Sequence, residues 1–175
     1  MSIQPNYSSR RILLPVKRWF IWATLVLAFF LNLIPFGHAI GFPDWVALVL
    51  AFWSVRESHR IGMSAAFALG ILTDVAAAGV MGQHALAYVL LVFAAGGLSR
   101  RILWFPLAQQ ALQILPLLLG TQLIMVITRM VAGADFPGLG YFLGSFTAAL
   151  LWYPLTFLLL LPQYQPTEKD ENRPI

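Results

Sequence analysis

The residue with the clearest chemical potential in this chain is Asp74, an acid inside a long apolar run. That run, residues 62–86, reads GMSAAFALGILTDVAAAGVMGQHAL. A carboxylate in hydrocarbon costs a few kcal/mol unless it is protonated, paired or hydrated. Such an acid can take part in a relay that moves protons or ions. Alternatively, it can form an ion pair that holds helices together. A relay normally needs several acids at staggered depths, and Asp74 is alone in its run, so the sequence favours structural pairing.

Several polar residues are expected near the depth of Asp74. They are Asn32, Gln83, His84 and Arg129. We expect a cluster in which Asp74 pairs with Arg129 or His84 and so joins three helices. Ser145 could complete a Ser/His/Asp set, which would indicate an intramembrane hydrolase. The local sequence FLGSF matches no nucleophile signature, and triads are defined by geometry, so catalysis is the weaker interpretation.

Small residues recur on the face of the run that carries Asp74. Gly62, Ala66 and Gly70 are each four residues apart, and this spacing lets a neighbouring helix come close. The neighbour belongs either to this chain or to a partner. Residues 140, 144 and 148 repeat the pattern.

Polar amides mark one face of the later run 107–131. Gln109 and Gln113 share this face with Pro116 and Gly120. Amides in a membrane helix bond across to neighbouring helices, which favours a face buried in protein. Water at the membrane interface satisfies them equally well, so both interpretations stay open. The histidines show no metal-ligand spacing, and we expect neither a metal nor a cofactor.

The elements that position these residues are membrane helices. Of 175 residues, 59% are hydrophobic and only 10% charged, and the mean hydropathy is +0.77. A soluble domain has about 25% charged residues, so the composition predicts an all-α polytopic membrane protein. No basic run is interleaved with exposed aromatics, so nucleic-acid binding is not expected. Six transmembrane helices are predicted over residues 19–35, 45–55, 62–80, 84–98, 107–131 and 140–161.

The second of these helices is the weakest span. The stretch 43–55 rises only about 20 Å, against roughly 30 Å of hydrocarbon. To span the hydrocarbon, this helix must include flanking residues or lie where the bilayer is thinned. Otherwise it ends before crossing the membrane. Pro43-Asp44-Trp45 places an N-cap aspartate just before it.

The charge distribution predicts the topology. Residues 1–18 form a basic cytoplasmic N-terminus, 19–161 a six-helix membrane domain and 162–175 a polar cytoplasmic tail. This arrangement leaves only Arg129 of the 11 basic residues near the outer face, as the positive-inside rule asks. Lys17-Arg18 and Gly37-His38-Ala39 resemble parts of a signal peptide. The apolar core between them is long for one, so we expect no cleavage.

Five segments, taken in order, carry a family resemblance. They are PDWVALVLAFW from Pro43, RIGMSAAFALGILTDV from Arg60, GVMGQHALAYVL from Gly79, FPLAQQALQ from Phe105 and ALLWYPL from Ala149. The pattern resembles the MreD family of bacterial rod shape-determining inner-membrane proteins over about residues 43–155. It departs from many members at Arg-Glu-Ser-His, residues 56–59, where they carry a proline.

The resemblance implies a non-enzymatic subunit of the elongasome, which supports peptidoglycan synthesis and cell shape. Implied partners are the bitopic scaffold MreC and RodA with its class B penicillin-binding transpeptidase, with the MreB filament beneath. Asp74, Gln83 and His84 match the family motif and are carried over as structural or interface positions. We expect the short second helix and the small-residue stripes to leave faces that MreC covers.

The same resemblance implies a fold similar to the substrate-binding subunits of energy-coupling-factor transporters. A small-solute or vitamin-binding transport subunit is therefore the alternative function. It would need a polar-lined cavity open to the periplasm.

Overall fold

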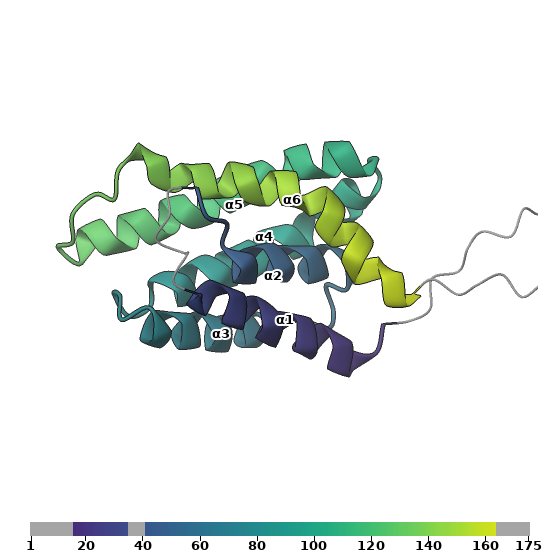
Figure 1. The fold of residues 1–175 in the computed structure, drawn as a ribbon, viewed down its shortest axis with the longest axis horizontal. Coiled ribbons are helices and arrows are strands. Elements are labelled where there is room, and N and C mark those ends of the chain that lie inside the picture. Colours follow the sequence, from purple (N-terminus) through teal and green to yellow (C-terminus); the bar gives the residue numbers. More distant parts are fainter. Residues whose placement is uncertain (1–15, 35–40, 164–175) are drawn as a thin grey trace, which may run out of the picture.

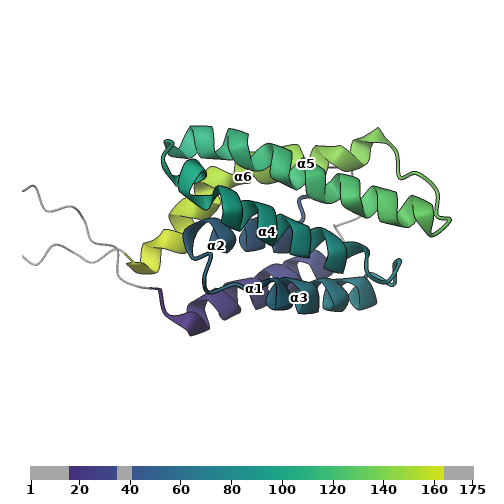
Figure 2. The same cartoon turned by 180° about the vertical axis from the view of Figure 1, so that it is seen from behind.

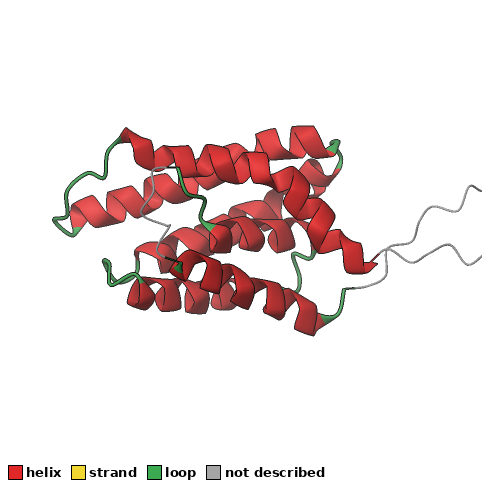
Figure 3. Cartoon of the chain, in the orientation of Figure 1, coloured by secondary structure: helices red, strands yellow, loops and turns green. Residues whose placement is uncertain are grey.

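The structure is a computed structural model that describes residues 16–34 and 41–163. Most of the expected basic N-terminus, nearly all of the polar tail and the signal-like residues 37–39 lie outside the described part. Within that part there are six α-helices and two short 3-10 helices. They are α1 (Arg18–Leu33), α2 (Trp45–Arg56), α3 (Met63–Ala76), α4 (Gln83–Leu103), α5 (Leu107–Val131), η2 (Leu139–Phe142), α6 (Leu143–Leu160) and η3 (Leu161–Gln163). The described residues contain no strand (Figure 3).

Consecutive helices run in opposite directions, and the six helices form two rows of three. Figure 1 shows α6, α2 and α1 in front, and Figure 2 shows α5, α4 and α3 from behind. The connections α1–α2, α3–α4 and α5–α6 lie at one end, hereafter the loop end. The connections α2–α3 and α4–α5 lie at the other, where the described chain also begins and ends. We call this second end the terminal end.

Helix α2 lies at the centre and is buried all round. Every residue from Val46 to Val55 is at most 4% exposed. A helix that is apolar on all sides is a core helix. Its 12 residues span only about 18 Å, yet its length need not match the bilayer because it touches other helices instead of lipid. The expectation that α2 leaves a face for MreC to cover is therefore wrong.

Local sequence marks the starts of α2 and α5, and an unusual backbone conformation ends α3. The side chain of Asp44 accepts a hydrogen bond from the Ala47 amide (3.0 Å), which confirms the predicted N-cap of α2. Helix α5 follows Pro106 and has the predicted bounds. Helix α3 ends at Ala76, four residues earlier than predicted, because Ala78 adopts a left-handed conformation (φ 48°). Its amide and that of Gly79 close the helix end on the Val75 and Asp74 carbonyls.

Among the residues that the structure describes, three segments are long and apolar enough to cross a membrane: α4, α5 and the continuous run of η2, α6 and η3. Helices α1 and α3 are shorter, at 16 and 14 residues, or about 24 and 21 Å. Pro154 lies inside α6, where its missing N–H interrupts the helical hydrogen bonds. Past the middle of α6 the helix turns away from α5 (Figure 1).

Candidate functional site

Asp74 is fully buried in the last turn of α3, where its carboxylate caps the N-terminus of α4. One oxygen, Oδ2, accepts from the amides of Gly82 (2.8 Å) and Ala85 (3.4 Å). The other, Oδ1, accepts from the His84 amide (3.0 Å) and lies 2.7 Å from His84 Nδ1. A helix N-terminus has amides without helical partners and a partial positive charge, so it stabilises a carboxylate. These contacts offset the cost of burying the acid.

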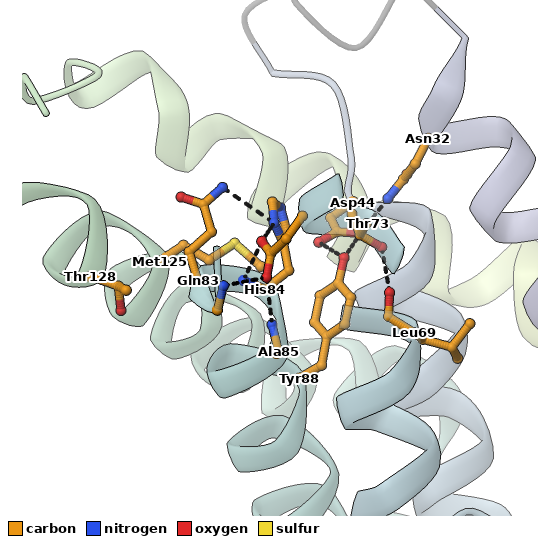
Figure 4. Close-up of polar contacts among 12 residues, drawn as sticks. Asn32, Asp44, Leu69, Thr73, Gln83, His84, Ala85, Tyr88, Met125 and Thr128 are labelled. Atoms are coloured by element: carbon orange, nitrogen blue, oxygen red, sulfur yellow. Dashed lines mark hydrogen bonds and ion pairs between the residues drawn. The ribbon is translucent and has the colours of Figure 1, made fainter. Parts of the chain in front are cut away.

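The structure thus brings Asp74 together with one of its two expected partners. His84 is the partner, and Arg129 forms no ion pair with Asp74. The Gln83 side chain is also buried, with its Nε2 3.2 Å from His84 Nδ1 (Figure 4). The sequence did not indicate the larger contribution to Asp74, which comes from backbone amides of the α3–α4 turn. Gly82, with φ 94°, allows that turn to aim its amides at the acid.

The small-residue stripe on α3 packs inside the molecule. A Cβ added to Gly70 would lie 2.3 Å from Ala85 Cα and 2.5 Å from Ala85 N. The backbones of α3 and α4 therefore touch at this point, and Ala66 on the same face is fully buried. Gly62 is exposed and precedes the first residue of α3. Ala66 and Gly70 hold α3 against α4, so they cannot also form a face for a partner protein.

A second acid, Asp44, gathers a network that the sequence did not predict. Its carboxylate accepts from the Tyr88 hydroxyl (2.8 and 3.0 Å) and from Asn32 Nδ2 (2.8 Å), besides capping α2. The Asn32 side-chain oxygen in turn accepts from the Trp45 amide (2.9 Å). Asp44 therefore ties α1, α2 and α4 together. Its N-cap position was readable from the sequence, but its contact with α4 depends on how the helices pack.

The two acid networks meet on α4. Tyr88 lies one turn after His84, and the centres of their rings are 5.7 Å apart in an edge-on arrangement (Figure 4). Asp74, His84, Tyr88, Asp44 and Asn32 thus form a continuous polar layer across α3, α4, α2 and α1 near the loop end. We call this set the polar layer.

A third group of polar contacts joins α5 to α6. Ser145 Oγ donates to Gln122 Oε1 (2.6 Å), and Gln122 Nε2 donates to the Tyr141 carbonyl (3.1 Å). A cavity of about 10 Å³, room for about one water, separates these residues from Asp44. Ser145 makes no hydrogen bond to His84 within the described residues, and its recorded partner is an amide. The Ser/His/Asp hypothesis therefore lacks its geometry, and this cavity is too small for a vitamin.

The remaining predicted residues lie apart from the polar layer. Arg129 is half-buried in the last turn of α5. Gln109 is exposed and Gln113 half-buried, whereas Gln110 is buried and donates to the Phe105 carbonyl (2.9 Å). Gln109 is thus not buried within this chain, and the two interpretations of the amide face, contact with another protein or with interfacial water, both stay open. Helix α5 is apolar nearly all round, so the polarity of its sequence does not show which face is buried. Packing against α4 and α6 determines that face.

The fold and these contacts define a helical membrane protein whose interior acids are held between helices. A family profile described as rod shape-determining protein MreD matches residues 14–161. The curated Rod shape-determining protein MreD of Haemophilus influenzae is 29% identical over 152 residues, covering 83% of this chain and 91% of that protein. No solved structure matches the chain. The chain belongs to the MreD family of rod shape-determining membrane proteins.

Proposed function

We propose that this chain is a non-enzymatic scaffold of the bacterial cell-wall elongation complex. Family membership supports this role, and one structural observation carries it. The interior acids Asp74 and Asp44 each have their oxygens engaged by donors of this same chain, at 2.7–3.4 Å. Groups engaged in this way stabilise helix packing and leave little capacity for a substrate.

The charge distribution supports a place in the inner membrane with both termini in the cytoplasm. Of the arginines and lysines in the described part, only Arg129 lies toward the loop end. The others are at the terminal end: Lys17, Arg18, Arg56, Arg60, Arg100 and Arg101. The positive-inside rule assigns the terminal end to the cytoplasm. The polar layer then lies toward the periplasm.

In this proposal MreC packs against the outer face of α3. The same complex includes RodA with its class B penicillin-binding transpeptidase and, indirectly, MreB. Two features favour α3. Ser64 and Ala68 are exposed and four residues apart, a spacing that lets another helix approach closely. At about 21 Å, α3 is also shorter than the hydrocarbon, and association with a partner helix relieves such a mismatch.

Depletion of the protein in a rod-shaped host tests the general role. The scaffold function predicts that cells become round, and continued rod growth would contradict it. The same depletion strain allows variants to be tested for restoration of rod shape.

Cysteine cross-linking tests the proposed MreC face, since the chain has no cysteine of its own. Phe67 on α3 is 54% exposed and Leu150 on α6 is 80% exposed. F67C should cross-link to cysteines placed along the MreC transmembrane helix, and L150C should not. Ala68→Leu should reduce co-purification with MreC, whereas Ala108→Leu, at an exposed position on α5, serves as the matched control. Equal cross-linking from both cysteines would exclude α3 as the specific face.

A further inference from the structure

A hollow at the terminal end lies between the start of α1 and the α2–α3 connection. It has a volume of about 280 Å³, and its lining residues are Arg18, Ile21, Trp22, His59, Arg60 and Ile61. Ile21 and Ile61 are each 3% exposed and give it an apolar inner side. Arg18, His59 and Arg60 are exposed at its rim. The hollow is therefore open, amphipathic and lined by basic side chains.

The charges around the hollow leave it positive. Arg60 Nε lies 3.0 Å from Glu57 Oε2, and Arg60 NH1 donates to the Val16 carbonyl (2.6 Å). These contacts hold the guanidinium in place and occupy two of its five N–H donors. Arg18 forms no ion pair with any carboxylate of the described residues. Arg60 is thus held in place and has N–H donors left for a ligand. The positive charge of Arg18 is not neutralised by a described carboxylate.

An exposed apolar face of α1 continues from the hollow toward the loop end. Its members recur every three or four residues: Trp19, Trp22, Val26, Phe30 and Leu33. Trp22, half exposed, belongs both to this face and to the wall of the hollow. Tryptophan side chains favour the boundary between headgroups and hydrocarbon. The site therefore presents cations at one end and a strip for hydrocarbon chains beyond them.

We propose that this hollow binds the headgroup phosphate of an anionic phospholipid whose acyl chains lie along the outer face of α1. The planar donor forks of arginine match phosphate oxygens, and basic pockets at the cytoplasmic side of membrane proteins bind anionic headgroups. This inference rests on the membrane placement proposed above. It assigns a ligand to α1, separate from the α3 face proposed for MreC.

Native mass spectrometry of the purified full chain, titrated with phosphatidylglycerol or phosphatidylcholine of equal chain length, tests the assignment. Wild-type protein should retain phosphatidylglycerol more tightly. Arg18→Gln should weaken that binding about fivefold, the effect of one surface charge near a headgroup. Arg101→Gln, at an exposed basic position of α4 at the same end, should leave it unchanged. Thermal unfolding of both variants verifies that they remain folded.

Three results would overturn the proposal. Equal retention of the two lipids would exclude the net negative charge of the headgroup as the determinant, since both lipids carry a phosphate and only phosphatidylcholine neutralises it with a choline cation. Equal weakening by Arg18→Gln and Arg101→Gln would show only a diffuse charge effect. Displacement of phosphatidylglycerol by glycerol phosphate at similar concentration would indicate a site for soluble anions. Because the assay uses the chain alone, it can fail while the cross-link to MreC is observed, and the reverse also holds.

Discussion

Replacing Gly70 by alanine tests the close approach of α3 to α4. The new Cβ would lie 2.3 Å from Ala85 Cα, so the helices must separate by about 1 Å to reach ordinary van der Waals contact. Overpacking of this kind costs about 1–3 kcal/mol. The separation would also break the bond from the Ala85 amide to Asp74, already 3.4 Å long, for about 1 kcal/mol more. We expect Gly70→Ala to lower the free energy of unfolding by roughly 2–4 kcal/mol.

The assay is unfolding of the purified chain in mixed micelles, followed by far-ultraviolet circular dichroism. Gly97→Ala is the matched control, because Gly97 lies in α4 and a Cβ there meets no atom within 4 Å. That change should be neutral or stabilise by up to about 1 kcal/mol, since alanine favours helix over glycine. If Gly70→Ala behaved like Gly97→Ala, the inferred backbone contact would be incorrect.

Three further tests concern the Asp44 network, the end of α3 and Ser145. Tyr88→Phe removes the hydroxyl that donates to both Asp44 oxygens and should cost about 1–3 kcal/mol in the same unfolding assay. Ala78→Gly should stabilise by about 1 kcal/mol, because glycine adopts φ 48° without strain, whereas Ala77→Gly, at φ −80°, should destabilise. Ser145→Ala should restore rod shape in the depletion strain, and wild-type protein should not react with a fluorophosphonate; labelling at Ser145 would revive the hydrolase hypothesis.

The sequence predicted the helical class and several helix ends. Asp44 and Pro106 lie beside the first residues of α2 and α5, and both starts were predicted correctly. The end of α3 was wrong because alanine rarely takes a left-handed conformation, and nothing in the local pattern marks Ala78 as the exception. Residues 77–80 were therefore predicted to be helical, although α3 ends at Ala76.

The candidate site was partly predictable. An isolated acid in an apolar run requires partners, which made Asp74 identifiable, and His84 was one of two partners expected. Its backbone donors were not predictable, because they depend on the conformation of the turn before α4. Tyr88 was missed because a tyrosine in an apolar helix is usually a core residue. Only the packing of α2 against α4 places its hydroxyl at Asp44.

The most direct test of the account is the comparison of stability and function in Asp74→Ala. Loss of the carboxylate leaves the amides of Gly82, His84 and Ala85 without their acceptor and should lower the free energy of unfolding by about 2–4 kcal/mol. The account predicts that any loss of rod shape follows the loss of folded protein, and that raising expression restores it. An Asp74→Ala protein with wild-type stability and abundance that still failed to support rod shape would show that the acid has a chemical role, and would contradict the account.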